Sequence, residues 1–72
     1  MKEKIIEIVA EMLQVDSSLI TENTLMEEIE EWDSLVQVMI IGEIEQRLGV
    51  SIDLEDAMEV TGVADLIRLC EK

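Results

Sequence analysis

The sequence predicts an all-α fold, a small helical bundle with three main helices, one short helix and a long loop after the first helix. Apolar residues recur at spacings of three and four in three separate stretches, which is the pattern of amphipathic helices. No stretch alternates for long enough to build a sheet, and the chain contains no proline. With only 72 residues, the chain is expected to form a single domain, residues 1–72.

The first helix is predicted from Lys2 to Gln14. Three glutamates stack four residues apart on one side, and the apolar residues fall on the other: Ile5, Ile6, Ile8, Val9, Met12 and Leu13. Residues 15–23 are rich in short polar side chains that compete with the backbone for hydrogen bonds, so they predict a long loop. We expect Leu19 and Ile20, inside this loop, to tie it to the core.

A short helical turn is predicted after the loop, because Thr24 and Glu27 have the spacing of a capping box. This turn carries three apolar residues, Leu25, Met26 and Ile29. An acidic run follows and surrounds Trp32, the only aromatic residue in the chain. We expect Trp32 to hold this segment on the bundle as a hydrophobic staple, with direct contact to a partner as the alternative.

The second long helix is predicted from Ser34 to Leu48, and both of its ends are marked. Asp33 or Ser34 can cap its start. Near its end, Arg47 suits the negative pole of the helix dipole, and Gly49 can adopt the left-handed conformation that ends a helix. Apolar residues cover more than half of its circumference: Leu35, Val38, Ile40, Ile41, Ile44 and Leu48. Such a helix packs centrally or presents an apolar strip to partners.

The remaining residues predict a connector and two further helices. Residues 50–54 alternate like a strand but are too short to form a sheet, so we expect an extended connector. A single helical turn is expected from Asp53 or Leu54 to Glu59, and a last helix from Thr61 to Glu71 with Thr61 as its cap. Cys70, the only cysteine, is expected to fill apolar space in the core.

Composition and charge exclude several classes of function. Eighteen acidic residues against five basic ones give a net charge of -13, which repels nucleic acids and anionic membrane surfaces. The chain has no histidine, a single cysteine and no calcium-loop spacing, so we expect no disulfide within the chain and no metal site. No catalytic residue is identified, and no long uncharged run indicates membrane insertion. We therefore expect a cytoplasmic, monomeric protein that is not an enzyme.

A known family pattern begins with the triplet Asp33-Ser34-Leu35 at the start of the second long helix. Further matching segments follow it: Ile44-Glu45, Leu48-Gly49-Val50-Ser51-Ile52, Glu55-Asp56 and Val60-Thr61. With the length, the acidity and the absence of histidine, these residues resemble the acyl carrier protein family over essentially the whole chain. The resemblance implies an acyl-carrier-like bundle and a single acyl carrier domain. From the residue types alone, a plain helix cap at Asp33 or Ser34 is the favoured interpretation, and only the resemblance favours modification.

The resemblance also implies how the chain works. Ser34 would receive a 4'-phosphopantetheine arm from coenzyme A, attached by a separate phosphopantetheinyl transferase, and the thiol of the arm would carry acyl groups as thioesters. Asp33 would help the transferase and its magnesium to engage the site, and Leu35 would anchor the carrier in an apolar pocket of a partner. These three residues are the predicted cofactor-binding site, and no residue of the chain is predicted to be catalytic.

The predicted docking surface departs from that of fatty-acid carriers. Val36 and Met39 stand where those carriers have acidic residues, and Trp32 replaces a small residue. We therefore expect a freestanding acyl carrier of a specialised pathway rather than of bulk fatty-acid synthesis. Expected partners are an acyl-loading ligase or synthase and acyl-transferring enzymes with basic and apolar docking surfaces. The predicted docking residues are Leu35, Val36, Met39, Glu45, Glu55 and Asp56.

The sequence also fits two alternative functions. The chain fits an aminoacyl or peptidyl carrier, although it lacks the Gly-Gly that usually precedes the modified serine in such carriers. It also fits an acidic helical adaptor that is never modified and binds a basic partner.

Met12, Met26 and Met58 are expected to pack in the core, with a flexible pocket for an acyl chain as the alternative.

Overall fold

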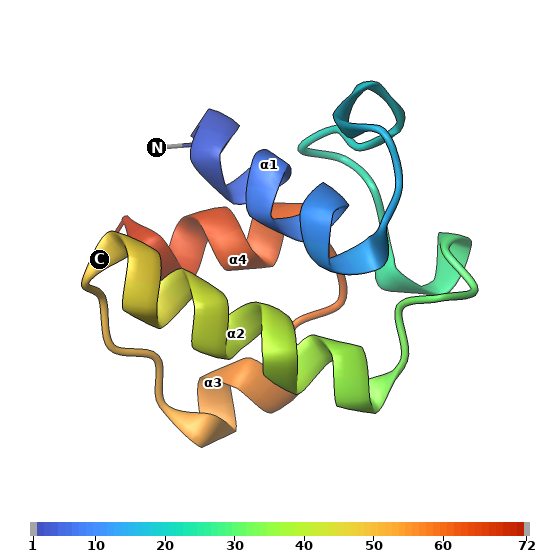
Figure 1. The fold of residues 1–72 in the computed structure, drawn as a ribbon. Helices are drawn as coiled ribbons and strands as arrows, with labels where there is room; N and C mark the ends of the chain where they lie inside the picture. Colours follow the sequence, from blue (N-terminus) through green and yellow to red (C-terminus); the bar gives the residue numbers. More distant parts are fainter. Residues whose placement is uncertain (1, 72) are drawn as a thin grey trace.

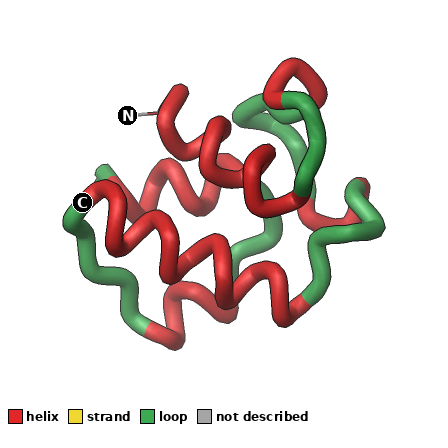
Figure 2. The backbone as a smooth tube through the Cα atoms, in the orientation of Figure 1, coloured by secondary structure: helices red, strands yellow, loops and turns green. Residues whose placement is uncertain are grey.

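The computed structural model describes residues 2–71. They form four α-helices: α1 (Lys2–Leu13), α2 (Ser34–Leu48), α3 (Leu54–Met58) and α4 (Val63–Cys70). Two 3₁₀ turns, η1 (Ser17–Leu19) and η2 (Met26–Glu28), lie between α1 and α2, and residues 2–71 contain no strand (Figures 1 and 2). Three long helices, one short helix and a long first loop are confirmed. None of the described helices is long and apolar enough to cross a membrane.

The core lies among the three long helices and is aliphatic. Helix α1 packs against both α2 and α4. Each of these helices supplies two of the largest side chains with essentially no exposed surface: Ile5, Val9, Ile40, Ile44, Val63 and Leu66. Cys70 is also buried, as expected, and this burial raises the pKa of its thiol. The spacing of apolar residues therefore identified the core face of α1 and α4, whereas on α2 two of the predicted apolar positions, Leu35 and Val38, are exposed.

Helix α2 begins and ends where the sequence places it. The Val36 N–H donates a 2.9 Å hydrogen bond to Asp33 Oδ1, so Asp33 caps the start of the helix. At the other end, Gly49 has a φ of 66° and donates its N–H to the Glu45 carbonyl. This left-handed conformation favours glycine and closes the helix. The connector after it has no regular structure, and α3 forms the expected single turn.

The sequence predicted that Leu19 and Ile20 tie the first loop to the core, and only Ile20 does so. Ile20 is buried, but Leu19 points to solvent with 68% of its surface exposed, so the prediction for Leu19 was wrong. The reason is η1, a 3₁₀ turn whose start is fixed by a 2.9 Å hydrogen bond from the Ser18 N–H to Asp16 Oδ1. This bond lowers the pKa of Asp16, and the turn directs Leu19 outward.

The caps predicted at Thr24 and Thr61 were also wrong. Thr24 Oγ1 accepts a hydrogen bond from the Thr21 N–H, and the turn η2 is instead fixed by the Leu25 N–H donating to Glu28 Oε1. Helix α4 begins two residues later than expected, at Val63. Its N-cap residue is Gly62, so no side chain caps the start of the helix.

A backbone bridge between Leu25 and Gly62 explains both errors. The Met26 N–H donates to the Thr61 carbonyl over 2.7 Å, and the Val63 N–H donates to the Thr24 carbonyl over 3.0 Å. The two segments lie so close that a Cβ on Gly62 would stand 2.6 Å from the Thr24 carbonyl oxygen. This contact between distant parts of the chain therefore sets where η2 and α4 begin.

Candidate functional site

Ser34 is the first residue of α2, and its side chain is exposed. The sequence left open whether Asp33 or Ser34 caps the helix, and the structure assigns this role to Asp33. The Ser34 hydroxyl makes no hydrogen bond within residues 2–71. It is therefore free to be modified without removing a contact that holds the helix.

The start of α2 fits an anionic group on Ser34. The first N–H groups of a helix lack partners within the helix, and the dipole of α2 places positive charge at this end. A phosphodiester on Ser34 would gain roughly 0.3–1 kcal/mol from this arrangement at an exposed position. No group of three or more acidic or cysteine side chains within residues 2–71 is arranged to hold a metal ion.

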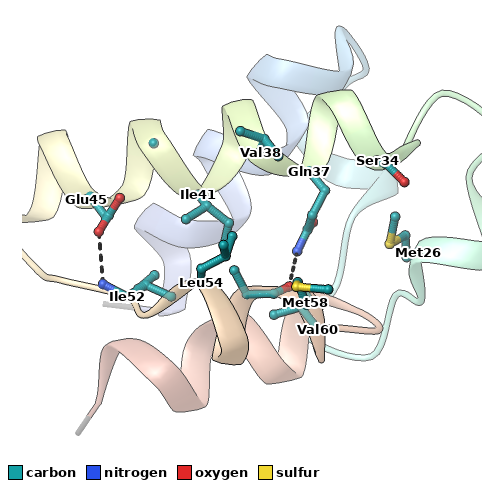
Figure 3. Close-up of a pocket in the computed structure, with 12 residues that line it drawn as sticks. Met26, Ser34, Gln37, Val38, Ile41, Glu45, Ile52, Leu54, Met58 and Val60 are labelled. Carbon is teal, nitrogen blue, oxygen red and sulfur yellow. Dashed lines mark hydrogen bonds between the residues drawn. The ribbon is translucent and has the colours of Figure 1, made fainter.

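A cavity of about 600 Å³ lies between α2 and α3, with Ser34 at one end (Figure 3). Helix α2 contributes residues that fall on one face, because they recur every three or four positions. The connector, α3 and the segments around Met26 and Val60 supply the opposite wall. The residues that line the cavity are Met26, Ser34, Gln37, Val38, Ile41, Gly42, Glu45, Ile52, Leu54, Ala57, Met58 and Val60.

Two polar side chains interrupt the apolar lining of this cavity. Glu45 accepts a 2.9 Å hydrogen bond from the Ile52 N–H and so fastens the connector to α2 (Figure 3). Gln37 is the only buried polar side chain among the described residues. Its Oε1 accepts a 2.7 Å hydrogen bond from the indole of Trp32, and its Nε2 donates over 3.3 Å to the Ala57 carbonyl.

An exposed apolar face is formed by large side chains of α2 and α3, three of which line the cavity. We define this apolar face as Leu35, Val38, Met39, Leu54 and Met58, whose exposed fractions range from 49% to 77%. The sequence predicted Leu35 and Met39 as docking residues, and both lie on this face. Val36 does not, because it is half-buried against the core.

Three members of the apolar face were missed. Val38 was counted only among the apolar residues of the helix, although its spacing to Leu35 is also that of an exposed strip. Leu54 and Met58 lie on the short α3, where five residues are too few for a periodic pattern. No signal in the sequence places α3 beside the start of α2.

The predicted acidic docking residues differ in their surroundings. Glu55 is exposed on α3, whereas Glu45 and Asp56 are half-buried. Because Glu45 is engaged by the Ile52 N–H, its carboxylate already has a structural role. Glu43, a further acid on α2, pairs with Arg47, which also binds Glu11 on α1.

Trp32 and two of the three methionines predicted for the core, Met12 and Met26, pack against or within it. Trp32 is 3% exposed, which confirms that it holds the loop on the bundle. Met12 is half-buried and packs against the core as expected. Met26 packs against the core and also lines the cavity, whereas Met58 is largely exposed at the cavity wall, so the core prediction was wrong for Met58.

Comparison with known proteins gives a consistent result. The family model described as "Phosphopantetheine attachment site" matches residues 3–70. The acyl carrier protein of Rickettsia massiliae is 36% identical over 67 residues, which are 93% of this chain and 78% of that protein. The acyl carrier protein of Rickettsia canadensis has the same identity and coverage.

Proposed function

The chain belongs to the acyl carrier protein family, and on this basis we propose that it carries acyl intermediates on a 4'-phosphopantetheine arm attached to Ser34. Members of this family are carriers rather than enzymes, and they bear the arm covalently. The thiol of the arm holds acyl groups as thioesters and delivers them to the enzymes that act on them.

One observation carries the assignment to Ser34: its hydroxyl is exposed at the start of α2, free of hydrogen bonds, at one end of the cavity. In the proposed attachment, Ser34 Oγ forms a bond to the phosphorus next to the pantetheine unit of coenzyme A. The pyrophosphate P–O bond breaks and adenosine 3',5'-bisphosphate leaves. The serine proton goes to a base that the transferase supplies, because this chain has no histidine and the neighbouring Asp33 carboxylate is engaged by the Val36 N–H.

The surroundings of Ser34 favour partner enzymes whose docking surface is apolar as well as basic. The apolar face favours a partner with an apolar patch around its active-site entrance, because burying such side chains stabilises a complex. The net charge of -13 adds long-range attraction to basic residues around that patch. Acidic residues are expected at the positions of Val36 and Met39 in bulk fatty-acid carriers, so we assign this carrier to a specialised pathway.

The cavity favours an acyl over an aminoacyl cargo. Its walls are mostly apolar, and the one carboxylate among them, that of Glu45, already accepts a hydrogen bond from the Ile52 N–H, so moving an ammonium group from water into the cavity is costly. An alkyl segment or part of the arm gains free energy there. The aminoacyl carrier is therefore the weaker of the two proposals.

Intact mass spectrometry tests the proposal. The purified chain is incubated with coenzyme A, magnesium and a broad-specificity phosphopantetheinyl transferase. The mass of the wild-type chain should rise by one arm, and that of Ser34→Ala should not change. Ser51→Ala is the matched control, because Ser51 is also exposed but lies in the connector, and it should be modified normally. An unmodified wild type would instead favour the acidic adaptor, and a modified Ser34→Ala would exclude Ser34 as the site.

A further inference from the structure

Gln37 crosses the cavity beside the proposed attachment site. It lies one turn after Ser34 on α2, and its side chain reaches toward the end of α3 (Figure 3). In the same view Ser34 and Met26 lie on one side of it, and Ile41 and Leu54 on the other. A group that enters from Ser34 and moves along the cavity therefore passes the amide of Gln37.

The two hydrogen bonds of Gln37 hold its amide in this position. Trp32, in the segment before α2, donates to Oε1, and the Ala57 carbonyl, in α3, accepts from Nε2. Because the side chain is only 8% exposed, rotation would leave buried polar groups without partners. The amide is thus a fixed feature of the cavity wall rather than a mobile surface group.

Half of the hydrogen-bonding capacity of this amide is unused. A glutamine amide has two N–H donors and an oxygen that can accept two hydrogen bonds. Within residues 2–71 the contacts of Gln37 use one N–H and one acceptor position. One donor and one acceptor position of the amide therefore remain unused, on a side chain that lines a mostly apolar cavity.

We propose that Gln37 determines the cargo specificity of this carrier and favours acyl groups that bear a hydroxyl group over plain alkyl chains of equal length. This proposal rests on the proposed function of Ser34. A hydroxyl group both donates and accepts, so it matches the two free positions of the amide. A plain alkyl chain at the same place would cover these positions and separate them from water without replacing the lost hydrogen bonds.

Thermal unfolding of loaded carriers tests the proposal. A transferase loads the chain from octanoyl coenzyme A and from its 3-, 5- and 7-hydroxy derivatives, and intact mass confirms each product. In the wild type, at least one hydroxyacyl form should melt roughly 4 °C above the octanoyl form, the shift expected for one net hydrogen bond in so small a domain. In Gln37→Met this difference should disappear. Gln46→Met, the same change at an exposed position of α2 outside the cavity, should retain it.

Each comparison is made between loaded forms of one variant, so a lower stability of Gln37→Met cancels. If that variant does not fold, NMR spectra of the loaded wild type test the proposal. The side-chain N–H signals of Gln37 should shift and show contacts to the cargo in a hydroxyacyl form, and they should do neither in the octanoyl form. Equal melting temperatures for all four wild-type forms, or unchanged Gln37 signals, would overturn the proposal.

Two further outcomes can be distinguished from recognition of the cargo by Gln37. If Gln37→Met changes the stability gained on adding the unloaded arm, the amide binds the arm itself and the proposal about cargo is wrong. If no transferase product forms at all, the proposed function fails before Gln37 is tested.

Discussion

The indole Nε1 of Trp32 donates a 2.7 Å hydrogen bond to Oε1 of Gln37, and both side chains are more than nine-tenths buried. This bond joins the segment before α2 to the wall of the cavity. It also explains how a polar residue can occupy the buried side of α2, since a buried amide without partners would be strongly unfavourable.

Removing the indole donor should destabilise the fold. Trp32→Phe leaves Gln37 Oε1 buried without this partner, and we expect the free energy of unfolding to fall by about 1–3 kcal/mol beyond the loss of packing. Gln37→Leu alone should also be costly. The double variant should cost less than the two single changes added together, because neither unpaired group remains. Urea unfolding followed by circular dichroism measures all three, and strict additivity would contradict the coupling.

The two aspartates at the starts of α2 and α3 should differ in their contribution to stability. Asp33→Ala removes the hydrogen bond to the Val36 N–H, so we expect a loss of about 1 kcal/mol. Asp53 occupies the same position before α3 but makes no side-chain hydrogen bond. Asp53→Ala should therefore change the unfolding free energy much less, and an equal loss in both variants would refute this assignment.

Asp33 also provides a way to separate capping from a role in modification. Asp33→Asn keeps an oxygen that can cap the helix but removes the charge, so stability should change by only a few tenths of a kcal/mol. If Asp33 helps the transferase and its magnesium, the rate of arm attachment should fall in this variant. Initial rates measured by intact mass decide between the two roles, and an unchanged rate would leave Asp33 as a cap alone.

The three glycines should respond differently to alanine. Gly62→Ala places a Cβ against the Thr24 backbone and should cost about 3 kcal/mol. Gly49→Ala should cost about 1 kcal/mol, because alanine is strained at a φ of 66°. Gly42→Ala should instead stabilise the chain by up to about 1 kcal/mol, since it lies within α2 and, apart from its chain neighbours and the backbone of α2 itself, no atom stands within 4 Å of the new Cβ. Melting temperatures give the order directly, and a destabilised Gly42→Ala would contradict it.

A negative charge on the apolar face should weaken docking. Met39→Glu is expected to lower the kcat/KM of transfer from the loading ligase or synthase by roughly tenfold, because a carboxylate must be desolvated against an apolar patch. Gln46→Glu makes the same charge change at an exposed position of α2 that is not on the apolar face. It serves as the control for net charge. Unchanged kinetics in Met39→Glu would exclude this face as the docking surface.

The carboxylate of Asp65 should make stability depend on pH. The N–H and the hydroxyl of Thr61 both donate to it over 2.8 Å, and these bonds, with Arg68 nearby, lower the pKa of Asp65 from its ordinary value. A carboxyl whose pKa is lower in the folded state stabilises that state above its unfolded pKa, and this contribution is lost as the pH falls through the folded pKa. Asp65→Asn should therefore cost roughly 1–2 kcal/mol at pH 7.

The difference between the wild type and Asp65→Asn should shrink as the pH falls below about 4 and reach its minimum under strongly acidic conditions. Urea unfolding across this range measures it. Glu30→Gln is the control, because Glu30 is exposed and has no ion pair or hydrogen bond within the described chain. A difference that stays constant with pH would assign the effect of Asp65 to something other than its charge.

The sequence predicted the fold well wherever the residues that determine a structural feature lie close to that feature along the chain. Helix α2 was placed correctly from Ser34 to Leu48, because Asp33 and Gly49 act on residues within one turn of themselves. The starts of η2 and α4 were missed, because the bridge between Leu25 and Gly62 joins residues that are far apart in the sequence. Spacing also cannot decide which of two adjacent apolar residues faces the core, as Leu19 and Ile20 illustrate.

The candidate site was predicted in part for the same reason. The position of Ser34 at a helix start follows from its neighbours in the sequence. The cavity does not, since its size depends on the distance between α2 and α3, which no residue spacing fixes. The sequence also did not predict that Gln37 is buried in the cavity wall. A single polar residue among apolar ones is ordinary on a surface helix, and the burial of Gln37 depends on the indole of Trp32.

With Trp32 as the only aromatic residue, all intrinsic fluorescence of the chain comes from one known place. That fluorophore is two positions before Ser34 and shares a hydrogen bond with a side chain that lines the cavity. An unlabelled sample therefore contains its own optical reporter, and titration with a tryptophan-free enzyme, or arrival of a cargo, is expected to be readable as a change in emission without any engineered dye.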